Sequence, residues 1–218
     1  MVGRIPSMHT LARFPAREAR LKCQAGNRAF TLIELLTVIG IIAILSSIAF
    51  GVIKGVNERA AIGQAKAELA ALSQSLEAYK KQYGDYPQTG SAANVVAGTT
   101  TASDTDGPGI LFNALTGKRG PSSTMVKMNA RSYLDLLRFS LQDSAALPGT
   151  DDSQAKNALL DPWGRRYVYY YKTSATWVQP SYVLMSSGPD GLIAAPLATT
   201  GDPQVSDAKN LDNLYANR

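Results

Sequence analysis

Residues 30–53 form an apolar run whose only ionisable side chain is Glu34. A helix of this run would be about 36 Å long at 1.5 Å per residue. Because the hydrocarbon core of a bilayer is about 30 Å thick, the run is long enough to cross it. We therefore predict a transmembrane helix over residues 30–53, and this segment constrains the fold more than any other part of the chain.

A basic stretch precedes the apolar run. Residues 1–29 hold six basic residues and one acidic residue, whereas the rest of the chain holds 16 of each. The positive-inside rule then places residues 1–29 in the cytoplasm and the C-terminal body on the other side of the membrane. The body has no excess of positive charge, so we expect it to bind no nucleic acid.

The same stretch contains the residues on which much enzyme chemistry depends. Cys23 is the only cysteine and His9 the only histidine. If residues 1–29 are removed, the remaining chain can form no disulfide, no zinc site of the Cys/His type and no Ser–His or Cys–His nucleophile. Catalysis by carboxylates stays open, but no pair of carboxylates stands in an evident catalytic setting. We predict that the protein is not an enzyme.

Glu34 needs an explanation, because an ionised side chain at membrane depth costs about 2.5–3.5 kcal/mol on insertion scales. It follows Phe30 by four residues, which is about one helical turn. A free amine created at Phe30 would therefore lie close to Glu34, in the same chain or in an adjacent copy. We predict that Glu34 is unpaired in a single subunit and paired in a polymer. The alternative is a side chain that merely reaches to the lipid headgroups.

The sequence AFTLIELLTVIGIIAIL, residues 29–45, resembles the cleavage and methylation segment of the type IV pilin and type II secretion pseudopilin superfamily. The resemblance implies that a prepilin peptidase of the membrane cuts between Ala29 and Phe30 and then methylates the Phe30 amine. It also implies that Glu34 is the assembly glutamate. The chain departs from the family at Ala29, where glycine is usual, and at Gly51, where many members have proline.

An ordinary secretory signal is the alternative interpretation of the N-terminal region. Ser47, Ile48 and Ala49 would then form a small-residue cleavage site, and the mature chain would start at Phe50. The apolar run is longer than the roughly 7–15 residues usual in such signals. This interpretation also gives Glu34 no role.

An amphipathic pattern follows the apolar run. Apolar residues recur at spacings of three and four at Ile62, Ala65, Leu69, Leu72, Leu76, Tyr79 and Tyr83. This heptad stripe is typical of a helix, and the sequence GDYP at residues 84–87 ends it. We predict one helix from Thr31 to Tyr83, whose outer half, within residues 54–87, packs its stripe against the body. A self-associating coiled coil is the alternative.

Residues 88–218 are predicted to form an α+β body. Residues 88–109 are rich in Gly, Ser and Thr and predict a surface loop that includes a DTDG turn. Residues 110–117 and 130–141 predict short helices. The DPWG turn at residues 161–164 introduces a β-rich segment. Strands are predicted at RYVYYY (residues 166–171) and SYVLM (residues 181–185), packed against the long helix.

The body resembles that of the major pseudopilins in its Tyr-Pro after the long helix, its DPWG turn and its SSGPDG sequence at residues 186–191. The resemblance implies a Ca²⁺ ion in the loop after the last strand. Asp190 matches the ligand aspartate, and carbonyl groups of residues 184–187 are candidate helpers. Asp212 is the first choice for a second carboxylate, with Asp207 and Asp202 as alternatives. Otherwise these aspartates simply form turns on a solvated tail.

The resemblance as a whole predicts a structural subunit of a type II secretion pseudopilus with a pilin-like fold. Such a subunit waits in the bacterial inner membrane with its body in the periplasm. It then polymerises through the N-terminal helix, together with minor pseudopilins and an inner-membrane assembly platform. The first alternative is a type IV pilus subunit for adhesion, motility or DNA uptake. A membrane-anchored enzyme or binding protein is the second.

Overall fold

The computed structural model describes residues 30–91, 102–122, 125, 128–151, 153–197 and 200–216, with residues 48–54 described by their helical backbone alone. The predicted leader at residues 1–29, and Ala29 with it, lies outside the described residues. So do residues 92–101 of the predicted loop at residues 88–109. The chain divides into two units, Met1–Ser47 and Ile48–Arg218, and the division falls inside helix α1, Leu32–Tyr83. The helix therefore starts one residue after its predicted start and ends at its predicted end.

The described part of the first unit is the beginning of α1, and its apolar side chains are exposed. Every large apolar residue from Phe30 to Leu45 is at least half exposed, with Phe30 at 84% and Leu45 at 60%. Among the described residues, no helix has both the length and the apolar character needed to cross a membrane. The side chains of residues 48–53, the last part of the predicted span, lie outside the described residues.

In the second unit, the predicted stripe of α1 is buried against the body. Leu69, Leu72 and Leu76 are at most 1% exposed and belong to the main hydrophobic core. The same core includes large residues of the body, among them Leu111, Phe112, Leu115, Tyr167, Tyr169 and Leu184. Because the stripe is covered by its own chain, it is not available for the coiled-coil alternative.

Helix α2, Gly107–Leu115, is completely buried. Asp106 caps it by accepting a hydrogen bond from the Gly109 N–H at 2.8 Å. This cap, with Pro108 in the first turn, starts the helix three residues before the predicted Ile110. Gly117, at φ +80°, follows the helix end.

The helix predicted over residues 130–141 is wrong. The structure has only a short 3₁₀ turn, η1 at Leu136–Arg138, followed by a strand. The Ser132 hydroxyl accepts from the Leu134 N–H, and the Asp135 carboxylate accepts from the Leu137 N–H, both at 3.2 Å. These local bonds satisfy backbone donors outside a helix, and the Tyr133 N–H donates to the Leu115 carbonyl at the end of α2.

The strands form two small antiparallel sheets. In the first, β1 (Ser140–Leu141) pairs with β2 (Leu159–Leu160). The second has the order β3-β4-β5, with β3 at Val168–Tyr170, β4 at Val183–Ser186 and β5 at Leu214–Tyr215. Strands β3 and β4 confirm the two predicted strands, whereas β1, β2 and β5 were not predicted. The fold is α+β, a helix followed by small antiparallel sheets, as expected of a pilin-like body.

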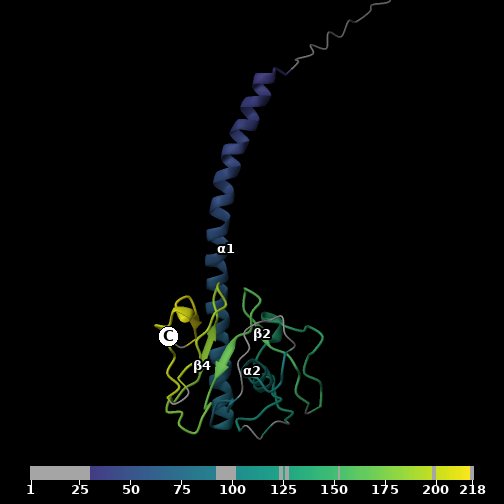
Figure 1. Ribbon diagram of the computed structural model, residues 1–218. Helices are drawn as coiled ribbons and strands as arrows, with labels where there is room; N and C mark the ends of the chain where they lie inside the picture. Colours follow the sequence, from purple (N-terminus) through teal and green to yellow (C-terminus); the bar gives the residue numbers. More distant parts are fainter. Residues whose placement is uncertain are drawn as a thin grey trace, which may run out of the picture. The chain divides into compact units, whose positions relative to one another are not determined.

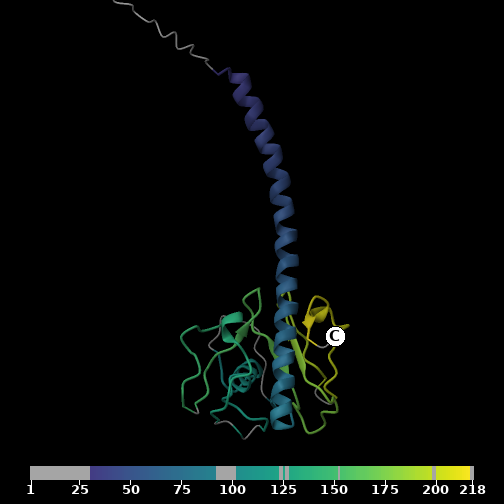
Figure 2. The ribbon, with the colours of Figure 1, turned by 180° about the vertical axis from the view of Figure 1, so that it is seen from behind.

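Tyrosine hydroxyl groups fasten the outer half of α1 to the body. Tyr167 on the β3 side donates to Glu68 at 2.7 Å, and Tyr86 donates to Glu77 at 2.6 Å. Figures 1 and 2 show the sheet along one side of this part of α1, with α2 on one flank and the C-terminal segment on the other. The loop with the predicted calcium ligands follows β4, which ends at Ser186.

Candidate assembly segment and cation loop

Glu34 and Thr31 together cap the N-terminus of α1. The Glu34 carboxylate accepts from the Thr31 backbone N–H at 2.9 Å and from the Thr31 hydroxyl at 2.8 Å. The Glu34 N–H in turn donates to the Thr31 hydroxyl oxygen at 3.3 Å. This is a capping box, in which a threonine and a glutamate three residues later satisfy donors at the helix start. The spacing Thr-x-x-Glu is visible in the sequence, but sequence reasoning missed the capping role of Thr31.

The capping box fixes where the negative charge of Glu34 lies. The first backbone N–H groups of a helix lack partners within the helix, and the macrodipole favours an anion there. Both hydrogen bonds from Thr31 go to carboxylate oxygen Oε2, and no described residue donates to Oε1. Glu34 can therefore hold Thr31 and accept a further donor. Its pairing with a terminal amine in another copy stays a prediction.

The loop after β4 that contains the predicted calcium ligands is called the cation loop below. It begins next to the DPWG turn, which is hydrogen-bonded to the last residue of β4. The Asp161 carboxylate accepts from the N–H groups of Trp163 and Arg165 and from the Ser186 hydroxyl, at 2.6–3.0 Å. Burial raises the pKa of Asp161, and these hydrogen bonds offset part of that rise. The Gly164 N–H donates to the Asp161 carbonyl at 2.9 Å, which confirms the predicted turn. The Arg165 guanidinium then donates to the carbonyl of Gly188, just beyond β4.

The structure brings Asp190 and Asp212 together. The Asp190 N–H donates to Asp212 Oδ2 at 3.2 Å, and Asp190 Oδ1 accepts from the Leu192 N–H at 2.8 Å. The two alternative carboxylates have other roles. Asp207 caps the 3₁₀ turn η2, Ala208–Asn210, and Asp202 accepts from Gln179 and from the Thr200 hydroxyl. Asp212 is thus the tail carboxylate that contacts Asp190.

Two of the predicted carbonyl helpers already have protein donors. The Leu184 carbonyl accepts from Ala216 at 2.9 Å, and the Ser187 carbonyl accepts from Gly191 at 3.2 Å. In the part of the chain that the structure describes, no three His, Cys, Asp or Glu side chains gather in a way that could hold a metal ion. Calcium binding by Asp190 and Asp212 therefore stays a prediction, and further ligands would have to be neutral oxygens.

Comparison with known proteins bears on the N-terminal segment. The prokaryotic N-terminal methylation motif matches residues 24–50. The matched range contains Ala29, Phe30, Thr31 and Glu34. No curated protein and no solved structure matches the chain. The motif implies processing by a prepilin peptidase, membrane anchoring and polymerisation, and it is found on structural subunits. The chain thus carries a prokaryotic N-terminal methylation motif around the predicted cleavage site between Ala29 and Phe30.

Proposed function

We propose that the protein is a structural subunit of a type II secretion pseudopilus. It is made as a precursor, cut between Ala29 and Phe30, methylated at the Phe30 amine and polymerised through the N-terminal half of α1. The observation that carries this proposal is the methylation motif at residues 24–50, located at the start of a helix whose apolar side chains are exposed. No catalytic role is assigned to any residue.

The exposed apolar residues of α1 support polymerisation by their energetics. Burying one large aliphatic side chain contributes about 1.5–3 kcal/mol relative to water. The side chains from Phe30 to Leu45 find no such burial within their own unit. In our proposal residues 30–53 lie in the inner membrane before assembly and pack against copies of the same helix in the fibre. The body then lies on the periplasmic side.

Glu34 selects the register between neighbouring subunits in this proposal. One carboxylate oxygen stays on Thr31, as in the capping box, and the other accepts from the methylated Phe30 ammonium of the next subunit. A charged group left without a partner at membrane depth is costly. Subunits that join in the wrong register are therefore disfavoured. Minor pseudopilins, the assembly platform and the prepilin peptidase are the other proposed partners.

The choice of a pseudopilus over a type IV pilus depends on the body. The DPWG turn fastened to β4 by Asp161 and the loop from Gly188 to Asp212 support it. In this proposal Asp190 and Asp212 hold a Ca²⁺ ion that would order the loop outside the cytoplasm. A deletion strain tests the choice. We expect loss of protein export with surface pili retained, whereas lost adhesion, motility or DNA uptake with normal export would favour the pilus.

Glu34→Gln tests the proposed role of Glu34 in assembly. Glutamine keeps an acceptor for the capping box but removes the charge. We expect the variant to be processed and stable in the membrane, yet absent from sheared or cross-linked filaments. Thr37→Ala, one turn further along the same helix, is the matched control and should assemble normally. Wild-type assembly of Glu34→Gln would refute the charge-pairing role.

A further inference from the structure

We propose that Ser187 and Asn213 supply the neutral oxygen ligands of the cation loop. The hydroxyl oxygen of Ser187 and the amide oxygen of Asn213 are buried and have no hydrogen-bond partner in the part of the chain that the structure describes. The two residues are 0% and 8% exposed. An unsatisfied buried polar group costs about 1–3 kcal/mol. Two such oxygens therefore indicate a missing positive or hydrogen-donating partner.

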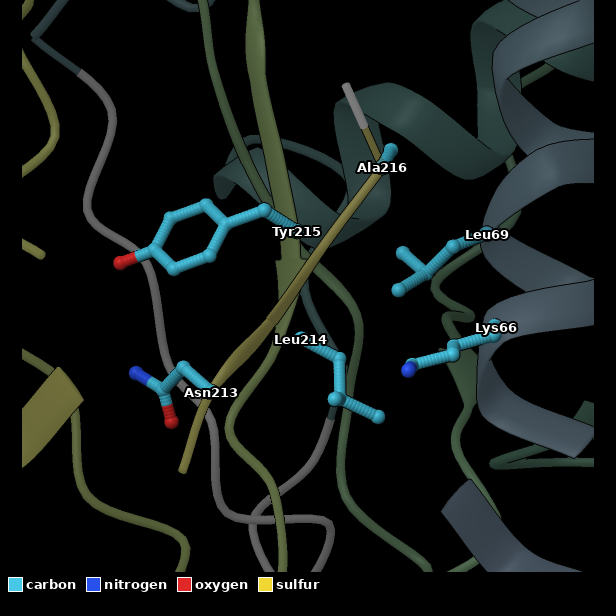
Figure 3. Close-up of a pocket in the computed structure, with 6 residues that line it drawn as sticks. All are labelled: Lys66, Leu69, Asn213, Leu214, Tyr215 and Ala216. Atoms are coloured by element: carbon cyan, nitrogen blue, oxygen red, sulfur yellow. The ribbon is translucent and has the colours of Figure 1, made fainter. Parts of the chain in front are cut away.

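The strand register places these two residues opposite each other. Met185 pairs with Tyr215 and Ser186 pairs with Leu214. Continued by one position, the register sets Ser187 against Asn213, and side chains at directly opposed positions share one face of the sheet. Figure 3 shows Asn213 and Tyr215 pointing to one side of β5, while Leu214 points to the other side, towards Leu69 and Lys66 of α1. The unpartnered oxygens therefore lie on the face turned away from α1.

Gly188, the residue after Ser187, lies close to Asp212. A Cβ atom built on Gly188 would lie 2.5 Å from the Asp212 carbonyl oxygen and 3.1 Å from Asp212 Oδ2. Glycine, at φ +63°, permits this approach. Asp212 Oδ2 also accepts from the Asp190 N–H. The strands end at Ser186 and begin again at Leu214, so the hydroxyl and Asp190 come from the turn after β4, and the amide and Asp212 from the segment just before β5.

The orientation of the Asn213 amide is set by its neighbours. Its nitrogen donates to the Asn210 amide oxygen at 2.8 Å. Asn210 in turn donates to the carbonyl groups of Ala194 and Gln204 and accepts from the Ala194 N–H. This network assigns the nitrogen of Asn213 to Asn210 and leaves its oxygen as the free acceptor. The segment around Asn210 therefore positions an oxygen rather than an N–H at the end of the sheet.

The charge of the cluster favours a divalent cation. Neither Asp190 nor Asp212 forms an ion pair with any residue that the structure describes. The nearby guanidinium of Arg165 donates to the Gly188 carbonyl instead. Two carboxylates with a hydroxyl and an amide oxygen form an all-oxygen donor set. Such donors suit Ca²⁺, a hard ion that takes six to eight oxygens with water among them.

The inference rests on the proposed Ca²⁺ ion but not on polymerisation. Its test is thermal unfolding of the full chain in detergent micelles, with calcium chloride or with EGTA. Ser187→Ala removes an unsatisfied hydroxyl, so we expect it to be as stable as the wild type or more stable in EGTA. In calcium we expect it to be less stable than the wild type, with Ca²⁺ affinity reduced by at least about tenfold. If Ser187 had only a structural role, the variant and the wild type would keep the same order of stability in EGTA and in calcium.

Two further variants complete the experiment. Asn213→Leu should also lose most of the difference in Tm between calcium and EGTA. The variant also loses the hydrogen bond to Asn210, which lowers Tm in both conditions, so only this difference is compared with the wild type. Asp202→Asn is the matched control, since it removes a carboxylate of the same tail that contacts Gln179 and Thr200. It should keep the full shift. An undiminished shift in Ser187→Ala overturns the ligand assignment alone. A wild type without any shift overturns the Ca²⁺ proposal with it and leaves the fibre proposal standing.

Discussion

Leu72 lies in the middle of the buried stripe of α1, and its replacement by alanine tests whether this stripe holds the helix to the body. The side chain is 0% exposed and belongs to the core shared by α1, α2 and the sheet. Removing a buried leucine side chain costs about 2–5 kcal/mol, from lost transfer energy and the cavity that remains. With a urea dependence of about 1–3 kcal/mol/M, the unfolding midpoint should fall by on the order of 1 M or more.

The assay is urea unfolding of the body in the full-length chain, followed by tyrosine and tryptophan fluorescence. Val56→Ala is the control, because Val56 is an apolar residue of the same helix that is 58% exposed. It should change the midpoint little. A loss in Leu72→Ala no larger than in the control would refute the packing described here. A midpoint that depends on protein concentration would instead favour the coiled-coil interpretation.

Two other predictions concern the charged residues of the body. Asp106→Ala should cost about 3–5 kcal/mol, because it leaves Arg166 buried without its carboxylate at 3.2 Å; a loss below about 1 kcal/mol in urea unfolding would contradict this. Burial alone would raise the pKa of Asp85, but hydrogen bonds from Lys172, Tyr171 and Gln88 outweigh it and hold the pKa below its ordinary value. Its contribution to stability should therefore be complete above about pH 4 and disappear as the pH falls through the lowered pKa. Unfolding measured against pH should show this acid-side loss in the wild type and a smaller one in Asp85→Asn.

The long helix and the two main strands were predictable because their signals are local. The stripe that includes Leu69, Leu72 and Leu76 has helical spacing, and RYVYYY is rich in β-branched and aromatic residues. Strands β1, β2 and β5 have two residues each. No periodicity can appear in so short a segment, so their pairing is decided by tertiary contacts alone.

The errors have physical causes in particular residues. Residues 130–141 have helical spacing, but Ser132 and Asp135 bond the local backbone and stop a helix. The Thr31–Glu34 capping box could have been recognised from its spacing. Ser187 and Asn213 could not, because their relation depends on the register between β4 and β5, which 27 residues of intervening chain do not reveal.

The central claim is that the chain is cut before Phe30 and methylated there, so that Glu34 meets a terminal ammonium in the assembled fibre. Intact-mass analysis of the protein from its own membrane tests this claim most directly. The account predicts a chain that begins at Phe30 and carries one added methyl group. A chain that begins at Met1 or at Phe50, or an unmodified Phe30, would contradict it.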